Sequence, residues 1–146
     1  MKTSTFKSEK MKKYIAILLV LSLVSTIGDS CSKSGFPVDE DGLLITARRE
    51  CFVSSFEILG PDFVTVRTKP AVVDTAAQTI AVEVQYGSDL KNLYPQFTLA
   101  SDCKLDPKVV GKVDFSDLGN PKKYTVVSGD RQVRKEYTIN LTVQLK

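Results

Sequence analysis

The reactive side chain with the most informative surroundings is the thiol of Cys31. Before it, Lys12 and Lys13 precede about fourteen residues rich in Ile, Leu, Val and Ala, and small residues follow. A charged segment, an apolar segment and a zone of small residues are typical of an export signal. The apolar run is shorter than the roughly 20 residues that a membrane-spanning helix needs. The sequence therefore predicts a signal peptide over residues 1–30, with Met11 as an alternative start.

The end of this signal resembles the lipobox of bacterial lipoproteins, in which small residues precede a cysteine that is diacylated and becomes the first residue after cleavage. Ser30 fits the small residue before the cleaved bond, whereas Gly28 and Asp29 depart from the usual Leu-then-small pattern. The resemblance implies that Cys31 carries palmitate-type chains and holds the protein at the outer membrane, on its cell-surface or periplasmic face. The alternative is an ordinary secretory signal cut nearby, which leaves Cys31 as a thiol.

If Cys31 carries lipid, Cys51 and Cys103 remain as a candidate pair. Joined in an oxidising compartment they would close a loop of about 50 residues, which stabilises a fold by about 3–4 kcal/mol. The alternative is two buried free thiols that act as small apolar side chains. The sequence does not reveal whether the two Cα atoms lie within reach. Both interpretations stay open, and the disulfide is the prediction.

Other groups that support catalysis or metal binding are scarce. The chain has no histidine, the commonest general base and metal ligand. A glycosidase needs two carboxyl groups that face one cleft, but the aspartates fall in predicted turns, where they favour turn formation. The acidic run 39–41 matches no EF-hand loop, and we interpret it as a solvated linker. We therefore predict no catalytic residue, no metal site and no cofactor.

Tyrosines are the side chains that could stack on sugar rings, since the chain has no tryptophan. Tyr86, Tyr124 and Tyr137 occupy inward positions of predicted strands, so we place them in the core. Tyr94 lies in the loop-like segment KNLYP and is the predicted ligand-binding residue. Capping one end of the fold is its alternative role.

The charge that remains after removal of the signal argues against a nucleic-acid partner. The whole chain has 20 Lys and Arg against 17 Asp and Glu, but residues 1–30 contain five basic and two acidic residues, so 15 of each sign remain. A protein that neutralises phosphates needs a basic excess. We therefore expect no binding to nucleic acid.

Short strands must position these groups. From Leu43 onwards apolar residues recur at every second position, the period of a half-buried strand. In the first strand we expect Val53 to face outward. Before the last strand, Gly129–Asp130 is expected to supply the positive φ angles of a tight hairpin turn. The inward residues expected in three strands are Phe52, Phe56 and Ile58; Ile80, Val82, Val84 and Tyr86; and Val133, Tyr137, Ile139, Leu141, Val143 and Leu145. About seven strands without a convincing helix predict an all-β, immunoglobulin-like β-sandwich over residues 46–146, after a tether over residues 31–45.

The segment TIAVEVQYGSDLKNLYPQFTLA, a DFS segment and KKYTVVSGDRQVRKEYTINLTV together resemble the Ig-like domains of Bacteroidota surface lipoproteins over about residues 50–146. The residues that carry the match are Gly87, Ser88, Asp89, Leu90, Pro95, Asp114, Phe115, Ser116, Pro121, Tyr124, Thr125, Val126, Tyr137 and Thr138. Many such domains have no assigned function, and others occur in glycan-utilisation or adhesin-like proteins. The resemblance implies a non-catalytic binding or accessory module of the cell envelope, for a glycan or a partner protein. The alternative is a structural or assembly subunit of an adhesin or surface appendage, whose edge strands pair with another chain.

Overall fold

The computed structural model describes residue 35 and residues 37–146. The predicted signal peptide and Cys31 lie outside the described residues. Across the part that is described, the chain forms strands and turns and no helix, so it holds no helix long and apolar enough to cross a membrane. The all-β prediction is confirmed.

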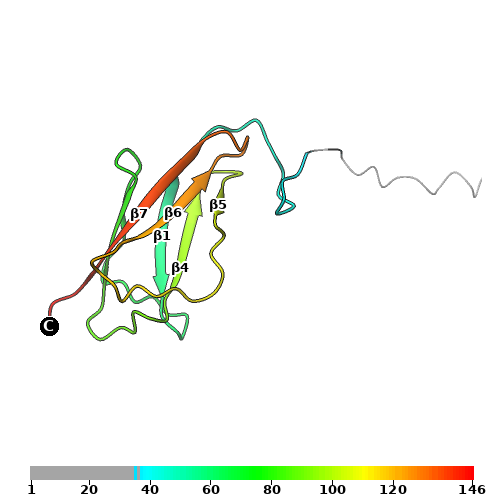
Figure 1. Cartoon of the computed structure of the whole chain (residues 1–146). Helices are drawn as coiled ribbons and strands as arrows, with labels where there is room; N and C mark the ends of the chain where they lie inside the picture. Colours follow the sequence, from blue (N-terminus) through cyan, green and yellow to red (C-terminus); the bar gives the residue numbers. More distant parts are fainter. Residues whose placement is uncertain (1–34, 36) are drawn as a thin grey trace, which may run out of the picture. The chain divides into compact units, whose positions relative to one another are not determined.

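Seven strands form two sheets (Figure 1). Their bounds are β1 (Val53–Leu59), β2 (Val72–Asp74), β3 (Thr79–Val84), β4 (Tyr94–Leu99), β5 (Lys104–Asp106), β6 (Lys122–Val127) and β7 (Arg134–Val143). One sheet has the order β1-β4 and the other β2-β3-β7-β6-β5. All neighbours are antiparallel except β3 and β7, which pair in parallel from Thr79 opposite Thr138 to Val84 opposite Val143. The arrangement is a β-sandwich.

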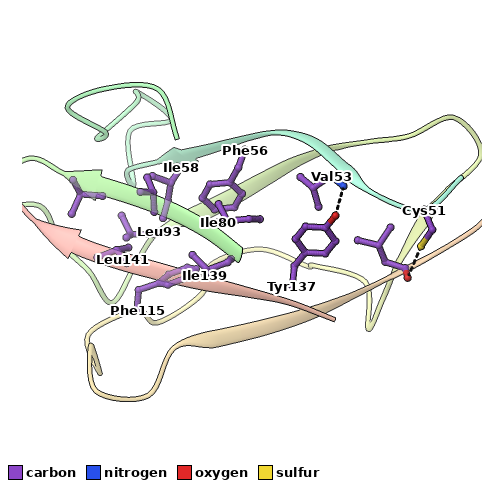
Figure 2. Close-up of a cluster of buried hydrophobic side chains, with 13 residues drawn as sticks. Cys51, Val53, Phe56, Ile58, Ile80, Leu93, Phe115, Tyr137, Ile139 and Leu141 are labelled. Atoms are coloured by element: carbon purple, nitrogen blue, oxygen red, sulfur yellow. Dashed lines mark hydrogen bonds between the residues drawn. The ribbon is translucent and has the colours of Figure 1, made fainter. Parts of the chain in front are cut away.

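The core lies between the two sheets and combines the inward residues of β1, β3 and β7 with Cys51, Leu93, Phe115 and Val126 (Figure 2). Phe56, Ile80 and Ile139 are all at least 98% buried. Tyr137 is fully buried as predicted, and its hydroxyl oxygen accepts a hydrogen bond of 3.4 Å from the backbone N–H of Val53. Burial raises the pKa of this phenol, because the ionised form loses its hydration. The buried ring is thus fixed to the facing sheet by a polar contact.

The predicted orientation of Val53 is wrong. Val53 is fully buried and Phe52 is only half-buried. The register with β4 shifts between Val53 and Ser55, so β1 contains a bulge that adds one residue. Such a residue reverses the alternation on one side of the bulge. Phe56 and Ile58, beyond it, face the core as expected.

Two residues predicted to face inward lie outside the core. Tyr86 is 61% exposed and Leu145 is 92% exposed. The strands that precede them end at Val84 and Val143, which pair with each other. Past that point neither residue has a facing sheet to pack against, so the period-two pattern of the sequence continues further than the strands do.

The hairpin between β6 and β7 was predicted at the right place but for the wrong reason. The residue with positive φ in the turn is Arg131, at 61°, and not Gly129 or Asp130. The loop is wider than a two-residue turn, since the N–H of Ser128 donates to the carbonyl of Val133 at 2.9 Å. At Gly129 an added Cβ would lie 3.1 Å from the carbonyl oxygen of Arg48. Glycine is required there by close approach of another segment.

Candidate functional site

The register defines two ends of the sandwich. Residues 38–46, here called the N-terminal strap, lie beside the β6–β7 turn, because the N–H of Thr46 donates to the carbonyl of Gly129 at 2.9 Å. We call this the strap end (Figure 1). The opposite, distal end contains the last residues of β1, β3 and β7 and the start of β4, where Leu59 pairs with Tyr94.

At the distal end, Phe63 and Tyr94 form a stacked aromatic pair. Their ring centroids are 4.7 Å apart and their planes are tilted by 31°. Tyr94 is half-buried and is the first residue of β4, whereas the sequence suggested a loop. Phe63 is 64% exposed. We call this pair the aromatic platform: Phe63 exposes most of its apolar surface to solvent, and Tyr94 exposes part of its own.

The turn before Phe63 holds its ring in place. The N–H of Phe63 donates to the carbonyl of Gly60 at 3.0 Å, and the N–H of Gly60 donates to the carbonyl of Val64 at 2.8 Å. Phe63 itself has φ of 61°, which is uncommon for a residue other than glycine, asparagine or aspartate. Sequence analysis missed Phe63 because its neighbours Val64 and Val66 alternate like strand residues. The signal that could have found it is a large apolar residue directly after Gly60-Pro61-Asp62.

Cys51 and Cys103 lie on adjacent segments as free thiols. Cys51 is buried, and its Sγ donates to the carbonyl of Val126 at 3.2 Å (Figure 2). Cys103 is half-buried and donates to the carbonyl of Glu50, the residue before Cys51, at 3.1 Å. Burial raises the pKa of both thiols, because it disfavours the thiolate. The disulfide between them stays a prediction.

The strap end is closed by ion pairs. The side chain of Asp39 is 3% exposed, and its Oδ2 lies 3.0 Å from both Lys104 Nζ and Arg131 Nε. Lys104 also contacts Glu40 at 2.9 Å and Asp41 at 2.6 Å. The interpretation of these acids as a solvated linker was therefore wrong for Asp39, which is buried against two cations that come from distant parts of the chain.

This environment shifts the acid–base equilibria of the pair. Burial raises the pKa of Asp39, but hydrogen bonds from Lys104 and from the N–H groups of Leu43 and Asp41 outweigh it, and the pKa falls to about 2. Hydrogen bonds to Asp41 and Glu40 raise the pKa of Lys104 above its ordinary value, against the effect of burial. Asp39 and Lys104 thus remain charged and paired within the fold. Over residues 35 and 37–146, no three acidic or cysteine side chains are arranged to hold a metal ion.

An apolar groove of about 350 Å³ lies between β4 and β5. Its apolar lining comes from both strands and their neighbours, namely Leu43, Pro95, Phe97, Leu99, Leu105 and Val109. Both strands are at an edge of their sheets. The groove thus lies along the open side of the sandwich, next to the strap.

The family described as "SGBP, N-terminal", the amino-terminal domain of starch/glycan-binding proteins, matches residues 58–141, which is more than half of the chain. The chain belongs to this family. The matched segment runs from β1 to β7 and includes both Phe63 and Tyr94. The match agrees with the resemblance to a surface-associated family of Bacteroidota. No curated protein sequence matches the chain.

Two solved structures from Bacteroides share the fold, and a third match is weaker. A candidate glycoside hydrolase from Bacteroides thetaiotaomicron is 28% identical with a TM-score of 0.54, and the match covers 66% of this chain and 26% of that one. A DUF4623 family protein from Bacteroides eggerthii is 16% identical with a TM-score of 0.51, over 66% and 22% of the two chains. A candidate secreted protein from Bacteroides fragilis is 12% identical with a TM-score of 0.45, over 66% and 97%. This chain therefore spans about a quarter of the length of the first two proteins.

Proposed function

We propose that this protein is a non-catalytic, glycan-binding accessory module of the Bacteroidota cell envelope. The proposal is carried by the exposed ring of Phe63, stacked on the half-buried ring of Tyr94, in a chain that belongs to the family of starch/glycan-binding proteins. The family supplies the ligand class, and the rings supply a surface that suits it. Tyr94 keeps the ligand-binding role expected from the sequence, and Phe63 joins it.

The chemistry of the platform fits a sugar ring. A pyranose has an apolar face of C–H groups that packs on the flat face of an aromatic ring, and tyrosine adds a hydroxyl that can bond a sugar hydroxyl. Both rings are held by the backbone, one by strand pairing with Leu59 and one by the turn at Gly60. The backbone positions of both rings are therefore fixed before a ligand binds, which lowers the entropic cost of ordering the segments that carry them.

Affinity electrophoresis tests this proposal. The full chain, purified in mild detergent, is run through native gels that contain soluble starch, xyloglucan, yeast mannan or polygalacturonate. We expect at least one neutral polysaccharide to retard it, and both Tyr94→Ala and Phe63→Ala to reduce the retardation. Val38→Ala is the matched control, because Val38 is a comparably exposed apolar residue, at 57%, on the strap.

Two results would contradict the proposal. If none of the neutral polysaccharides retards the wild-type chain, glycan binding is wrong. If binding occurs but both aromatic variants bind like the wild type, the site is wrong.

The cellular location in this proposal is the outer membrane, through lipidated Cys31. Its support is the lipobox-like end of the signal. Intact mass spectrometry of the protein from host membranes should give residues 31–146 plus acyl chains. A further loss of two hydrogens would establish the disulfide between Cys51 and Cys103. An unacylated mass would reject the anchor.

A specific observation favours the second candidate function, that of a structural or assembly subunit. β4 and β5 are edge strands with an apolar groove between them, where a strand of another chain could pair. Light scattering at increasing protein concentration would reveal polymers in that case. A monomer at all concentrations would argue against it.

A further inference from the structure

A second concave surface lies at the distal end and includes the exposed ring of Tyr86. It is a hollow of about 450 Å³. Its lining is mostly polar and consists of Arg67, Thr68, Gln85, Tyr86 and Gln144. These residues come from the segment after β1, from the end of β3 and from the end of β7. We call this surface the amide hollow.

The backbone fixes the positions of the two glutamines. The N–H of Gln85 donates to the carbonyl of Val66 at 2.8 Å, and the N–H of Gln144 donates to the carbonyl of Val84 at 2.8 Å. Both residues directly follow paired strand ends. Their side chains therefore extend from a rigid base, although both are exposed to solvent.

The side chains of the hollow differ in whether they already have partners. Arg67 donates to the carbonyl of Phe56 at 3.2 Å and pairs with Glu57 at 2.5 Å. Thr68 donates its hydroxyl to Glu83 at 2.5 Å. In contrast, among the hydrogen bonds of residues 37–146, none uses the side-chain amide of Gln85 or of Gln144.

The unpaired amides suit a ligand that carries hydroxyl groups. An amide carries both donors and an acceptor, as the hydroxyl pairs of a sugar do. Of the two cations at the hollow, the guanidinium of Arg67 is already paired with Glu57, so an anionic ligand would have to use Lys146, which the anionic probe below tests. The ring of Tyr86 has one partner, Lys146 Nζ at 5.9 Å from its centroid. That long side chain is flexible and can move aside for a sugar ring.

One segment connects the hollow to the aromatic platform. Residues 60–68 carry Phe63, which stacks on Tyr94, and end in Arg67 and Thr68, which line the hollow. Arg67 in turn forms a bridge with Val84, just before Gln85. We propose that the amide hollow is a second saccharide subsite, which binds a further unit of the neutral glycan chain that stacks on Phe63 and Tyr94. This inference rests on the proposed function.

Isothermal titration of the full chain with oligosaccharides of two lengths tests the inference. The probes are the trisaccharides and hexasaccharides of maltose, cellulose and mannan type, with trigalacturonate as the anionic probe. We expect a hexasaccharide to bind the wild type more tightly than its trisaccharide. Tyr86→Ala and the double variant Gln85→Ala/Gln144→Ala should weaken hexasaccharide binding about fivefold and leave trisaccharide binding unchanged. Gln132→Ala, an exposed glutamine at the strap end, is the control.

The possible failures are distinguishable. If the wild type binds a hexasaccharide and neither the Tyr86 variant nor the double variant weakens it, the second subsite is wrong and the proposed function stands. If trigalacturonate binds more tightly than every neutral trisaccharide, the assignment to neutral glycans is wrong. If no probe binds, both the inference and the proposed function are rejected. Unchanged thermal unfolding of the variants confirms that they fold.

Discussion

The two ends of the sandwich use their side chains in opposite ways. At the strap end, Asp39 is 3% exposed and holds Lys104 and Arg131 at 3.0 Å. At the distal end, Phe63 is 64% exposed and stacks on Tyr94, and two glutamine amides have no partner among residues 37–146. Charges are thus buried and paired at one end, while apolar rings and amides are exposed at the other.

This difference indicates where binding can take place. A buried ion pair already has the partners that compensate its loss of hydration, so little of its interaction capacity remains for a ligand. Exposed rings in contact with water gain free energy when a ligand covers them. We therefore expect substitutions at the strap end to change stability, and substitutions at the distal end to change binding.

Gly129→Val should have the largest effect on stability. The new Cβ would lie 3.0 Å from Asp102 Cβ and 3.1 Å from the carbonyl oxygen of Arg48, so the strap end must open or shift. Overpacking of this kind costs about 2–3 kcal/mol, measurable by urea unfolding. Gly119→Ala is the control, since its Cβ would meet Asp117 at an ordinary 3.5 Å. Equal stability of the two variants would contradict the close approach at Gly129.

Asp39→Asn should have the next largest effect. Arg131 would lose its carboxylate partner, and Lys104 would keep only Glu40 and Asp41. Because the two cations are largely buried, we expect Tm to fall by roughly 5 °C. Glu40→Gln removes a carboxylate from the same lysine but at an 82% exposed position, and it should change Tm much less. A larger fall for the Glu40 variant would reverse our ranking of the two acids.

The pH dependence of stability should depend on the same residue. The pKa of Asp39 is about 2 in the folded protein, against an ordinary value of 3.8. The contribution of Asp39 to the free energy of unfolding is therefore present above pH 4 and is lost as the pH falls towards 2. The reason is that the unfolded chain takes up a proton in this range that the folded chain does not. Thermal unfolding between pH 5 and pH 2 should show a steeper decline for the wild type than for Asp39→Asn. Parallel curves would contradict the low pKa.

Phe63→Ala should have the smallest effect on stability and a clear effect on binding. Its ring is mostly exposed, so the free energy of unfolding should change by less than about 0.5 kcal/mol. Affinity for a retarding polysaccharide should fall about tenfold, measured in the same gels. A large loss of stability would mean that the ring supports the fold. It would contradict the expectation that substitutions at the distal end change binding and not stability.

Local patterns predicted the strands well where nothing interrupts them. Tyr137, Ile139 and Leu141 are buried at alternate positions of β7, as the period of two requires. The same pattern failed at Val53, where a bulge adds a residue, and at Tyr86, where β3 has ended. Both failures have the same cause. The neighbouring strand, and not the strand's own residues, determines where the hydrogen-bonded pairing shifts register or ends.

For the candidate site, the sequence identified one residue of the platform. Tyr94 was selected as a tyrosine outside the expected core, but its partner Phe63 lies in another turn, next to residues that alternate like those of a strand. Nothing in the spacing of the two residues indicates that they stack, since Leu59 and the turn at Gly60 bring them together. The amide hollow is likewise built from three separate segments.

By itself, the sequence determined the all-β class, the alternating core of β7 and the lack of histidine, because each depends on composition or on neighbouring residues. Only the tertiary structure decided the parallel pairing of β3 with β7, the burial of Asp39 between Lys104 and Arg131, and the stacking of Phe63 on Tyr94. These features join residues that are distant along the chain. The contacts that stabilise these features form only when the two sheets pack together, so a local pattern of residues cannot predict them.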